Sequence, residues 1–198
     1  MNALRSGMVA VAVVAAPAFA QFSFVSGACV DGAGHTGLNA GVRGPCGDLR
    51  GADLEGAQLS RLDLSGARLD GAKLKGASLQ GTNLRGASLE NADLSKAVLT
   101  GANLERASLI GARLVGAHLE HAVLTQAVLA GADLRNACLF RAGFEGADLR
   151  TAQFSKSRAM VEGARFSHAI VGVDTLPFTA RELTALDVVD APVELSRR

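Results

Sequence analysis

The residues best suited to chemistry in this sequence are one cysteine and two histidines near its middle. Cys138 lies twenty residues after His118, and Glu120 and His121 lie beside that histidine. Thiolate and imidazole are the ligands that zinc and copper prefer, and a suitable neighbour lowers the pKa of a thiol. If residues twenty apart become neighbours, the spacing predicts a metal site or an activated thiol at His118, His121 and Cys138. The alternative is a chance neighbour pair on a solvated surface.

The other two cysteines, Cys29 and Cys46, flank a glycine-rich segment without a regular apolar pattern. Such a segment buries little apolar surface, and closing a loop of this size with a covalent link stabilises by ~3 kcal/mol in the chain-entropy model. Disulfides persist in oxidising compartments. We therefore expect a disulfide between Cys29 and Cys46, with two reduced cysteines as the alternative.

The first twenty residues have the features of a secretory signal peptide. A basic residue, Arg5, precedes the apolar stretch 8–16, and residues 18–20 form an A-x-A cleavage site. The apolar stretch is shorter than the ~20 residues of a membrane span. We expect cleavage after Ala20 and a bacterial periplasmic or secreted mature chain that is not inserted in a membrane. A buried N-terminal helix is the alternative.

The composition excludes several classes of function. The chain has 20 Lys and Arg against 19 Asp and Glu, and removing Arg5 with the signal leaves 19 of each. A neutral chain gives no electrostatic reason to bind nucleic acid or an anionic membrane. None of the common hydrolase, metalloprotease or nucleotide-binding motifs is present. We expect a protein that is not an enzyme and needs no cofactor.

A period of five organises residues 49–154. All 22 of the positions 49, 54, 59 and onward to 154 are Leu, except Phe144 and Phe154. Two residues before each, from 52 to 152, Ala occupies 19 of 21 positions, with Leu62 and Thr82 as exceptions. This period fits neither a helix nor an uninterrupted strand, but it fits short extended segments that alternate with tight turns.

The units A-D-L-E-G (52–56), A-N-L-E-R (102–106) and A-D-L-R-N (132–136) resemble the pentapeptide-repeat family. The resemblance covers residues 47–155 and implies an all-β, right-handed quadrilateral β-helix. In such a helix four pentapeptides form each coil, Leu or Phe stacks on the axis, and Ala lies at the inner corners.

The pattern slips by two residues near 155–158 and resumes at Ala159 for four more units. After Pro177, the sequence Thr179-Ala180-Arg181-Glu182 is typical of a capping box that starts a short helix. Solenoids need caps at their open ends. We expect four regions, namely a signal peptide (1–20), an N-terminal cap (21–46), the β-helix (47–176) and a C-terminal helical cap and tail (177–198).

Charges twenty residues apart alternate in sign, and the alternation supports a twenty-residue coil. The column before every fourth Leu contains Asp53, Lys73, Asp93, Arg113 and Asp133. Opposite charges on neighbouring strands contribute ~0.2–1 kcal/mol each. Some members of the family that this chain resembles mimic DNA, bind DNA gyrase and confer fluoroquinolone resistance. Sustained negative columns are needed for that mimicry, so the alternation and the signal peptide exclude this interpretation.

Apolar side chains break the polar pattern of the outward positions between 110 and 130. The predicted interface consists of Ile110, Val115, Val123, Val128 and Ala130. Ile110 and Ala130 should stack in one column with Val128 beside them, and Val115 and Val123 should lie around the adjoining corners. A contiguous apolar patch on a flat face often marks an interface with a partner protein or a second copy. The alternative is that Val and Ile simply favour extended backbone. Phe140, on the opposite face, is a separate candidate.

The main functional hypothesis is a non-enzymatic interaction or scaffold protein of the periplasm or extracellular space, which presents a rigid flat face to its partner. Two alternatives remain open. One is a metal or thiol site at His118 and Cys138, and the other is a structural rod of the cell envelope that packs laterally.

Overall fold

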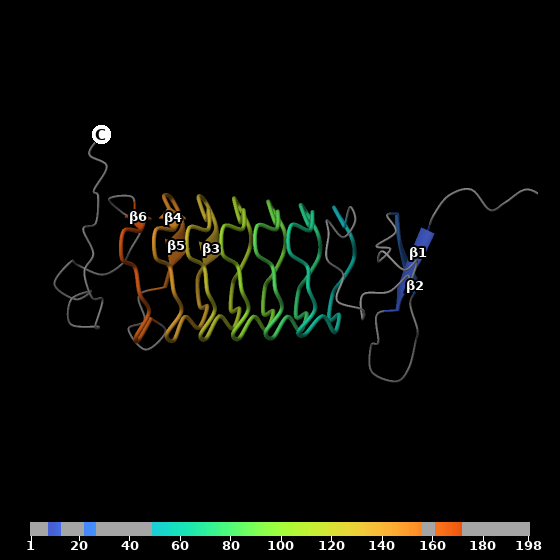
Figure 1. Cartoon of the computed structure of the whole chain (residues 1–198), viewed down its shortest axis with the longest axis horizontal. Coiled ribbons are helices and arrows are strands. Elements are labelled where there is room, and N and C mark those ends of the chain that lie inside the picture. Colours follow the sequence, from blue (N-terminus) through green and yellow to red (C-terminus); the bar gives the residue numbers. More distant parts are fainter. Residues whose placement is uncertain (1–7, 13–21, 27–48, 156–160, 172–198) are drawn as a thin grey trace, which may run out of the picture.

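The computed structural model of the chain describes residues 8–12, 22–26, 49–155 and 161–171. Residues 49–155 and 161–171 form a straight stack of coils of similar size (Figure 1). The predicted disulfide Cys29–Cys46 and the predicted helix after Pro177 lie outside the described residues. No helix is present in the described part of the chain.

Six short strands are assigned, and the remaining contacts between coils are single bridges. The strands are β1 (Met8–Ala12), β2 (Phe22–Ser26), β3 (Asp133–Leu134), β4 (Asp148–Leu149), β5 (Gln153–Phe154) and β6 (Ile170–Val171). Strands β1 and β2 pair antiparallel, from Met8↔Ser26 to Ala12↔Phe22. Strand β3 pairs parallel with β5, and β4 pairs parallel with β6.

Each coil contains twenty residues, as the sequence predicts. Parallel bridges join Asp53 to Lys73, Lys73 to Asp93, and so on at steps of twenty around all four sides. The step widens to 22 at Gly143↔Arg165 and Asp148↔Ile170, which is the register of two extra residues between these coils. Each coil therefore consists of four pentapeptides, and each pentapeptide forms one of its four sides.

The four sides are named here by one residue of the central column of each. Bridged columns define them: the Asp53 face (53, 73, 93, 113, 133, 153), the His118 face (58, 78, 98, 118, 138), the Val123 face (63, 83, 103, 123, 143, 165) and the Val128 face (68, 88, 108, 128, 148, 170). The chain follows them in this order, so consecutive faces meet at the turns.

Backbone hydrogen bonds hold neighbouring coils together. Asn103 N donates to Thr82 O in the preceding coil at 2.9 Å, and Leu104 N donates to Val123 O in the following coil at 2.7 Å. Within each turn a further bond closes the chain, as from Ala107 N to Leu104 O at 3.0 Å. Extended segments too short to pair alone are stabilised in this way by the coil on either side.

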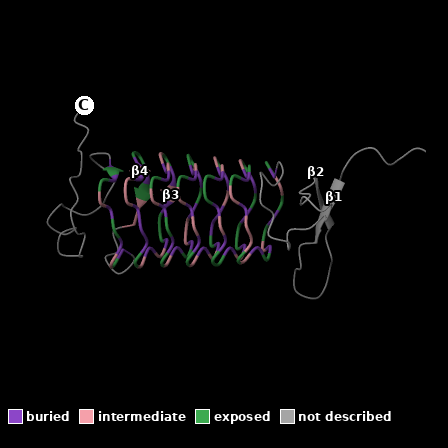
Figure 2. Cartoon of the chain, viewed as in Figure 1, coloured by how far each residue is buried: buried purple, intermediate pink, exposed green. Residues whose placement is uncertain are grey.

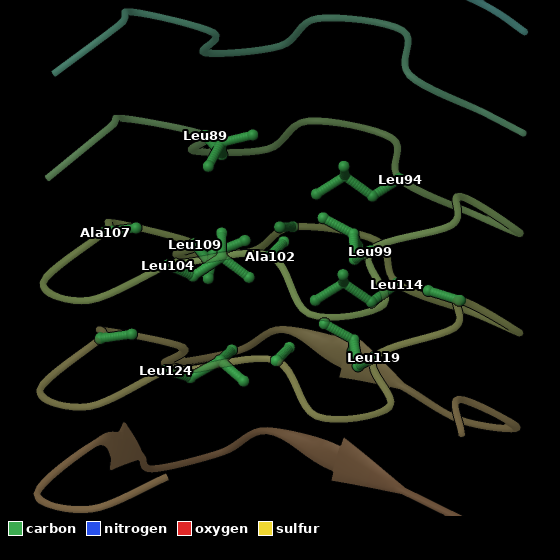
Figure 3. Packing of buried hydrophobic residues seen from close by; sticks show 14 of the residues in the cluster. Leu89, Leu94, Leu99, Ala102, Leu104, Ala107, Leu109, Leu114, Leu119 and Leu124 are labelled. Carbon is green, nitrogen blue, oxygen red and sulfur yellow. The ribbon is translucent and has the colours of Figure 1, made fainter. Parts of the chain in front are cut away.

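The axis of the stack is filled by leucine. In the central coils the leucine side chains point inward in stacked columns: Leu89 lies above Leu109 on one side and Leu99 above Leu119 on the other (Figure 3), and each is 0% exposed. Along every coil, buried positions alternate with half-buried and exposed ones (Figure 2). Towards the C-terminal end, Phe144 and Phe166 replace leucine in one column and stack with ring centroids 5.0 Å apart.

The two exceptions to the alanine pattern, Leu62 and Thr82, are neighbours in one column and are physically connected. The turn bond from Leu62 N to Leu59 O is 3.4 Å long, whereas the other turns have 2.9–3.1 Å. The fully buried Thr82 hydroxyl donates to the same Leu59 oxygen at 2.7 Å. Threonine thus supplies a hydrogen bond to a carbonyl whose own turn bond the larger leucine has lengthened.

Candidate functional site

The charges of the Asp53 face neutralise one another along the column. Lys73 Nζ lies 3.4 Å from Asp53 Oδ2, and beside them Lys75 Nζ lies 3.5 Å from Glu55 Oε1. At the other end, Arg135 donates two hydrogen bonds to Asp133, and these bonds hold the pKa of Asp133 below its usual value although partial burial opposes them. The alternation predicted from the sequence is confirmed by the bridges of this column.

Cys138 and His118 are stacked on the His118 face, as their spacing predicts. Their backbones form a parallel bridge. The carboxylate of Glu120 links the surrounding groups, because Oε1 lies 3.1 Å from His118 Nδ1 and Oε2 accepts a hydrogen bond from the Thr100 hydroxyl at 3.1 Å. The polar groups of this face are therefore paired with one another.

The structure does not assemble the metal site predicted at His118, His121 and Cys138. Among residues 49–155 and 161–171, no three His, Cys, Asp or Glu side chains are placed to hold a metal ion. His121 lies on the turn and packs edge-on against Phe140, with ring centroids 5.7 Å apart. His121 therefore packs against the Phe140 ring, and a site that it shares with His118 and Cys138 stays a prediction.

The surroundings of the Cys138 thiol disfavour its activation. It is a half-buried free cysteine. Burial raises its pKa, and a hydrogen bond to Glu120 and the negative charge of that carboxylate raise the pKa further, although a backbone hydrogen bond from Phe140 opposes them. A raised pKa lowers the thiolate fraction at neutral pH and so argues against an activated thiol at this position.

Phe140 is half-buried and has partners of its own. The guanidinium of Arg141 lies 4.9 Å from the centre of its ring, in addition to the contact with His121. A ring held between a cation and an imidazole exposes less apolar surface than the sequence alone indicates.

The five residues of the predicted apolar interface are not contiguous. Ile110 and Val123 are the most exposed, at 41% and 39%, and Val115, Val128 and Ala130 are half-buried. Val123 belongs to the Val123 face, and Val115 lies at the far corner of the Asp53 face. The quarter turn made by every pentapeptide distributes side chains that are close in sequence around the rod. Only Ile110, Val128 and Ala130 remain on one face.

On the Val128 face, apolar residues replace a polar pair that recurs in the preceding coils. There, a serine in the central column donates a hydrogen bond to the carboxylate that lies eighteen residues earlier. The pairs are Ser88 with Asp70, and Ser108 with Glu90 at 3.0 Å. Val128 and Ile110 have the same separation and occupy the same two positions in the next coil. Along this face, the apolar pair of Ile110 and Val128 thus follows two pairs of a serine and a carboxylate.

The Val128 face contains a further exposed apolar residue that the sequence analysis missed. Ile170 is 37% exposed and lies in the same column as Val128, with Asp148 between them. Next to Asp148, Arg150 forms an ion pair with that carboxylate, with Nη2 2.6 Å from Oδ2. The shifted repeat at Ala169 already contained the signal for Ile170, since it places this residue outward. Two of the three large apolar residues exposed in the described chain therefore share one face.

In the part of the chain that the structure describes, no helix is long and apolar enough to cross a membrane.

Sequence and structure comparisons identify relatives of the chain. The profile described as "Pentapeptide repeats (8 copies)" matches residues 47–76, 72–109 and 102–139. No curated protein sequence matches the chain. A pentapeptide repeat protein from the thylakoid lumen of Arabidopsis thaliana is 32% identical, with 55% of this chain and 69% of that chain covered and a TM-score of 0.43.

Two further solved structures are similar. HetL, a pentapeptide repeat protein involved in heterocyst differentiation regulation in the cyanobacterium Nostoc, is 29% identical, with 69% of this chain and 72% of that chain covered and a TM-score of 0.45. Full-length QnrB1, a plasmid-mediated fluoroquinolone resistance protein, is 21% identical, with 73% and 80% covered and a TM-score of 0.55, so this likeness concerns the fold alone. The repeat family and the likeness in fold to QnrB1 imply a right-handed β-helix, and the bridges show four pentapeptides in each coil. The chain belongs to the pentapeptide-repeat family.

Proposed function

We propose that this protein is a non-enzymatic interaction module, which acts in the periplasm or extracellular space and presents a rigid flat face to a protein partner. The observation that carries the proposal is the Val128 face. There, Ile110, Val128 and Ala130 take the positions that serines and carboxylates occupy in the preceding coils. Because leucine fills the axis, the outward faces are the surfaces available for recognition. Exposed apolar residues on a rigid, otherwise polar face favour binding of another protein.

Export to the periplasm or beyond rests on the signal-like residues 1–20. In the uncleaved chain, β1 pairs with β2 across Ala20. Cleavage after Ala20 would separate these two strands, so their pairing belongs to the precursor. Mass spectrometry of the protein from the periplasmic fraction of its host tests the location, with Gln21 as the expected first residue. Recovery of the intact chain from the cytoplasm alone would contradict it.

Photo-crosslinking in the host tests the interaction itself. A photoreactive amino acid is placed at Ile110 on the Val128 face or, as a control, at Val123, which is almost equally exposed on the adjacent face. We expect a defined crosslinked protein band from position 110 and none from position 123. In a matched pair of variants, Ile110→Lys should abolish partner capture, and Val123→Lys should retain it, with both variants folding like the parent.

The same experiment separates the proposed module from a structural rod of the cell envelope. A rod that packs laterally would crosslink from several faces alike, and its crosslinks would survive Ile110→Lys. Crosslinks from neither position would contradict the proposal. The interrupted negative columns, with Lys73 and Arg113 between the aspartates, support an absence of nucleic-acid mimicry.

A further inference from the structure

The Val128 face has an ordered sequence of charge along the rod. From position 70 to position 150, the turn column at its edge contains two acidic residues, then two apolar residues, then one basic residue. They are Asp70, Glu90, Ile110, Ala130 and Arg150, and Arg50 precedes them in the first coil. Beside them, the central column contains Arg68, Ser88, Ser108, Val128, Asp148 and Ile170. Ile110 and Ala130 therefore lie midway between Glu90 on one side and Arg150 on the other.

We propose that this face binds the same face of a second copy, with the two rods antiparallel. The twofold axis would lie between the coil of Ile110 and the coil of Ala130, and parallel to their strands. This inference rests on the proposed function and names the partner. A symmetric interface requires a surface that is complementary to itself after rotation.

The rotation exchanges coils at equal distances from the axis. Ile110 of each copy meets Ala130 of the other, and Val128 meets Ser108. One coil further out, Glu90 meets Arg150 of the other copy, and the Ser88 hydroxyl meets the Asp148 carboxylate. Each of these pairs occurs twice. The side chain of Arg150 is 57% exposed and the guanidinium carries donors beyond those that bind Asp148, so it is placed to reach a second carboxylate.

Other arrangements of the same face are less favourable. With the rods parallel, the twofold axis would run along the rod and each coil would meet the same coil of the other copy. Asp148 of the central column would then lie opposite Asp148, and like charges at an interface cost free energy. With the axis at the level of Ile110, the carboxylate of Glu90 would be covered by Ala130 and lose water without gaining a cation. The antiparallel register between the two coils is the one that pairs apolar with apolar groups and Glu90 with Arg150.

The size of the face predicts a weak, reversible dimer. Five spacings of ~4.8 Å between strands give a face about 24 Å long, and a strand of three residues makes it about 10 Å wide. Such a face offers roughly 250 Å² of flat area, well below the ~800 Å² per partner of a standard stable interface. We therefore expect dissociation on dilution rather than a permanent dimer.

Charge reversal in the purified exported protein tests the register. Sedimentation velocity over a concentration series should show dimers of the parent at high concentration. Glu90→Arg and Arg150→Glu should each shift dimerisation to at least tenfold higher concentration, and the double variant should recover most of the loss. Because Glu90 and Arg150 are three coils apart in one chain, about 14 Å, recovery would report contact between copies. Val123→Lys, on another face, should behave as the parent.

Cysteine crosslinking provides a second measurement that does not depend on the charges. In a Cys138→Ser background, Ile110→Cys and Ala130→Cys are made in separate chains. Oxidation of the mixture should give a disulfide-linked dimer, whereas either variant alone should give little. Crosslinking of Ile110→Cys alone at least as strong as that of the mixture would overturn the proposed register.

A parent that remains monomeric at millimolar concentration overturns the dimer. A dimer that is insensitive to both charge reversals, or single losses without recovery, also overturns it. These results concern purified protein, so they leave the proposed function intact if position 110 still crosslinks to a different protein in the host. Failure of that host experiment together with a monomeric protein would contradict both.

Discussion

Leu62 and Thr82 should be energetically coupled, because both act on the carbonyl of Leu59. Leu62 leaves its turn bond to that oxygen at 3.4 Å, and the buried Thr82 hydroxyl donates to the same oxygen at 2.7 Å. Replacing the hydroxyl by a methyl group of similar size, in Thr82→Val, leaves a buried acceptor with only the long bond. Loss of such a partner costs about 1–3 kcal/mol in the free energy of unfolding.

Leu62→Ala restores the residue found at most equivalent positions and allows the turn bond to shorten towards 3.0 Å. In that background Leu59 O retains a good donor, so we expect Thr82→Val to cost ~0.5–1 kcal/mol less than in the parent. Urea denaturation of the parent, both single variants and the double variant, followed by circular dichroism, gives the four free energies. Equal costs of Thr82→Val in the two backgrounds, within ~0.3 kcal/mol, would refute the coupling.

Three other predictions concern the axis, the thiol and the surface ion pairs. Leu104→Ala, in a fully buried position of a central coil, should lower the free energy of unfolding by ~2–5 kcal/mol in urea denaturation, and a loss below ~1 kcal/mol would show that the coils collapse around the cavity. Cys138 should react with iodoacetamide at pH 8 more slowly than free cysteine, and Glu120→Gln should accelerate the reaction by removing a negative charge that raises the thiol pKa; no acceleration would contradict the role of that charge. Arg135→Ala should lower stability at pH 7 but not at pH 2. The lowered pKa of Asp133 stabilises the fold at pH values above 3.8, the pKa of the carboxyl in the unfolded chain, and this contribution disappears as falling pH protonates the carboxyl in the folded chain. Urea midpoints across this range measure the effect, and an equal loss at both pH values would refute it.

The period of five was sufficient to predict the coil and the face of each residue from 49 to 154. A backbone with one hydrogen-bonding register has little freedom, so Asp53 had to lie beside Lys73 once the repeat length was known. The same rule placed Cys138 above His118. It would also have placed Ile170 on the Val128 face if it had been applied across the two extra residues.

Side-chain direction could not be predicted in the same way. The sequence places His121 on the corner that follows His118, but it does not show that the His121 ring packs against Phe140. The pKa of Cys138 depends on burial and on the orientation of the Glu120 carboxylate, which no repeat pattern contains. The repeat did place Ile110, Val128 and Ala130 together and Val123 around a corner, but it could not give the exposed fraction of each side chain.

Because each pentapeptide makes a quarter turn, the length of an insertion or duplication decides on which face all later side chains lie. A duplication of twenty residues would move every later side chain one coil along the rod and keep it on its face. A duplication of five would transfer all later side chains to the next face without disturbing the leucine axis. The two extra residues before Ala164 do neither, because Asp148 still pairs with Ile170 on the same face. A two-residue insertion therefore leaves later side chains on their faces, whereas a five-residue change would redirect a whole surface in a single genetic event.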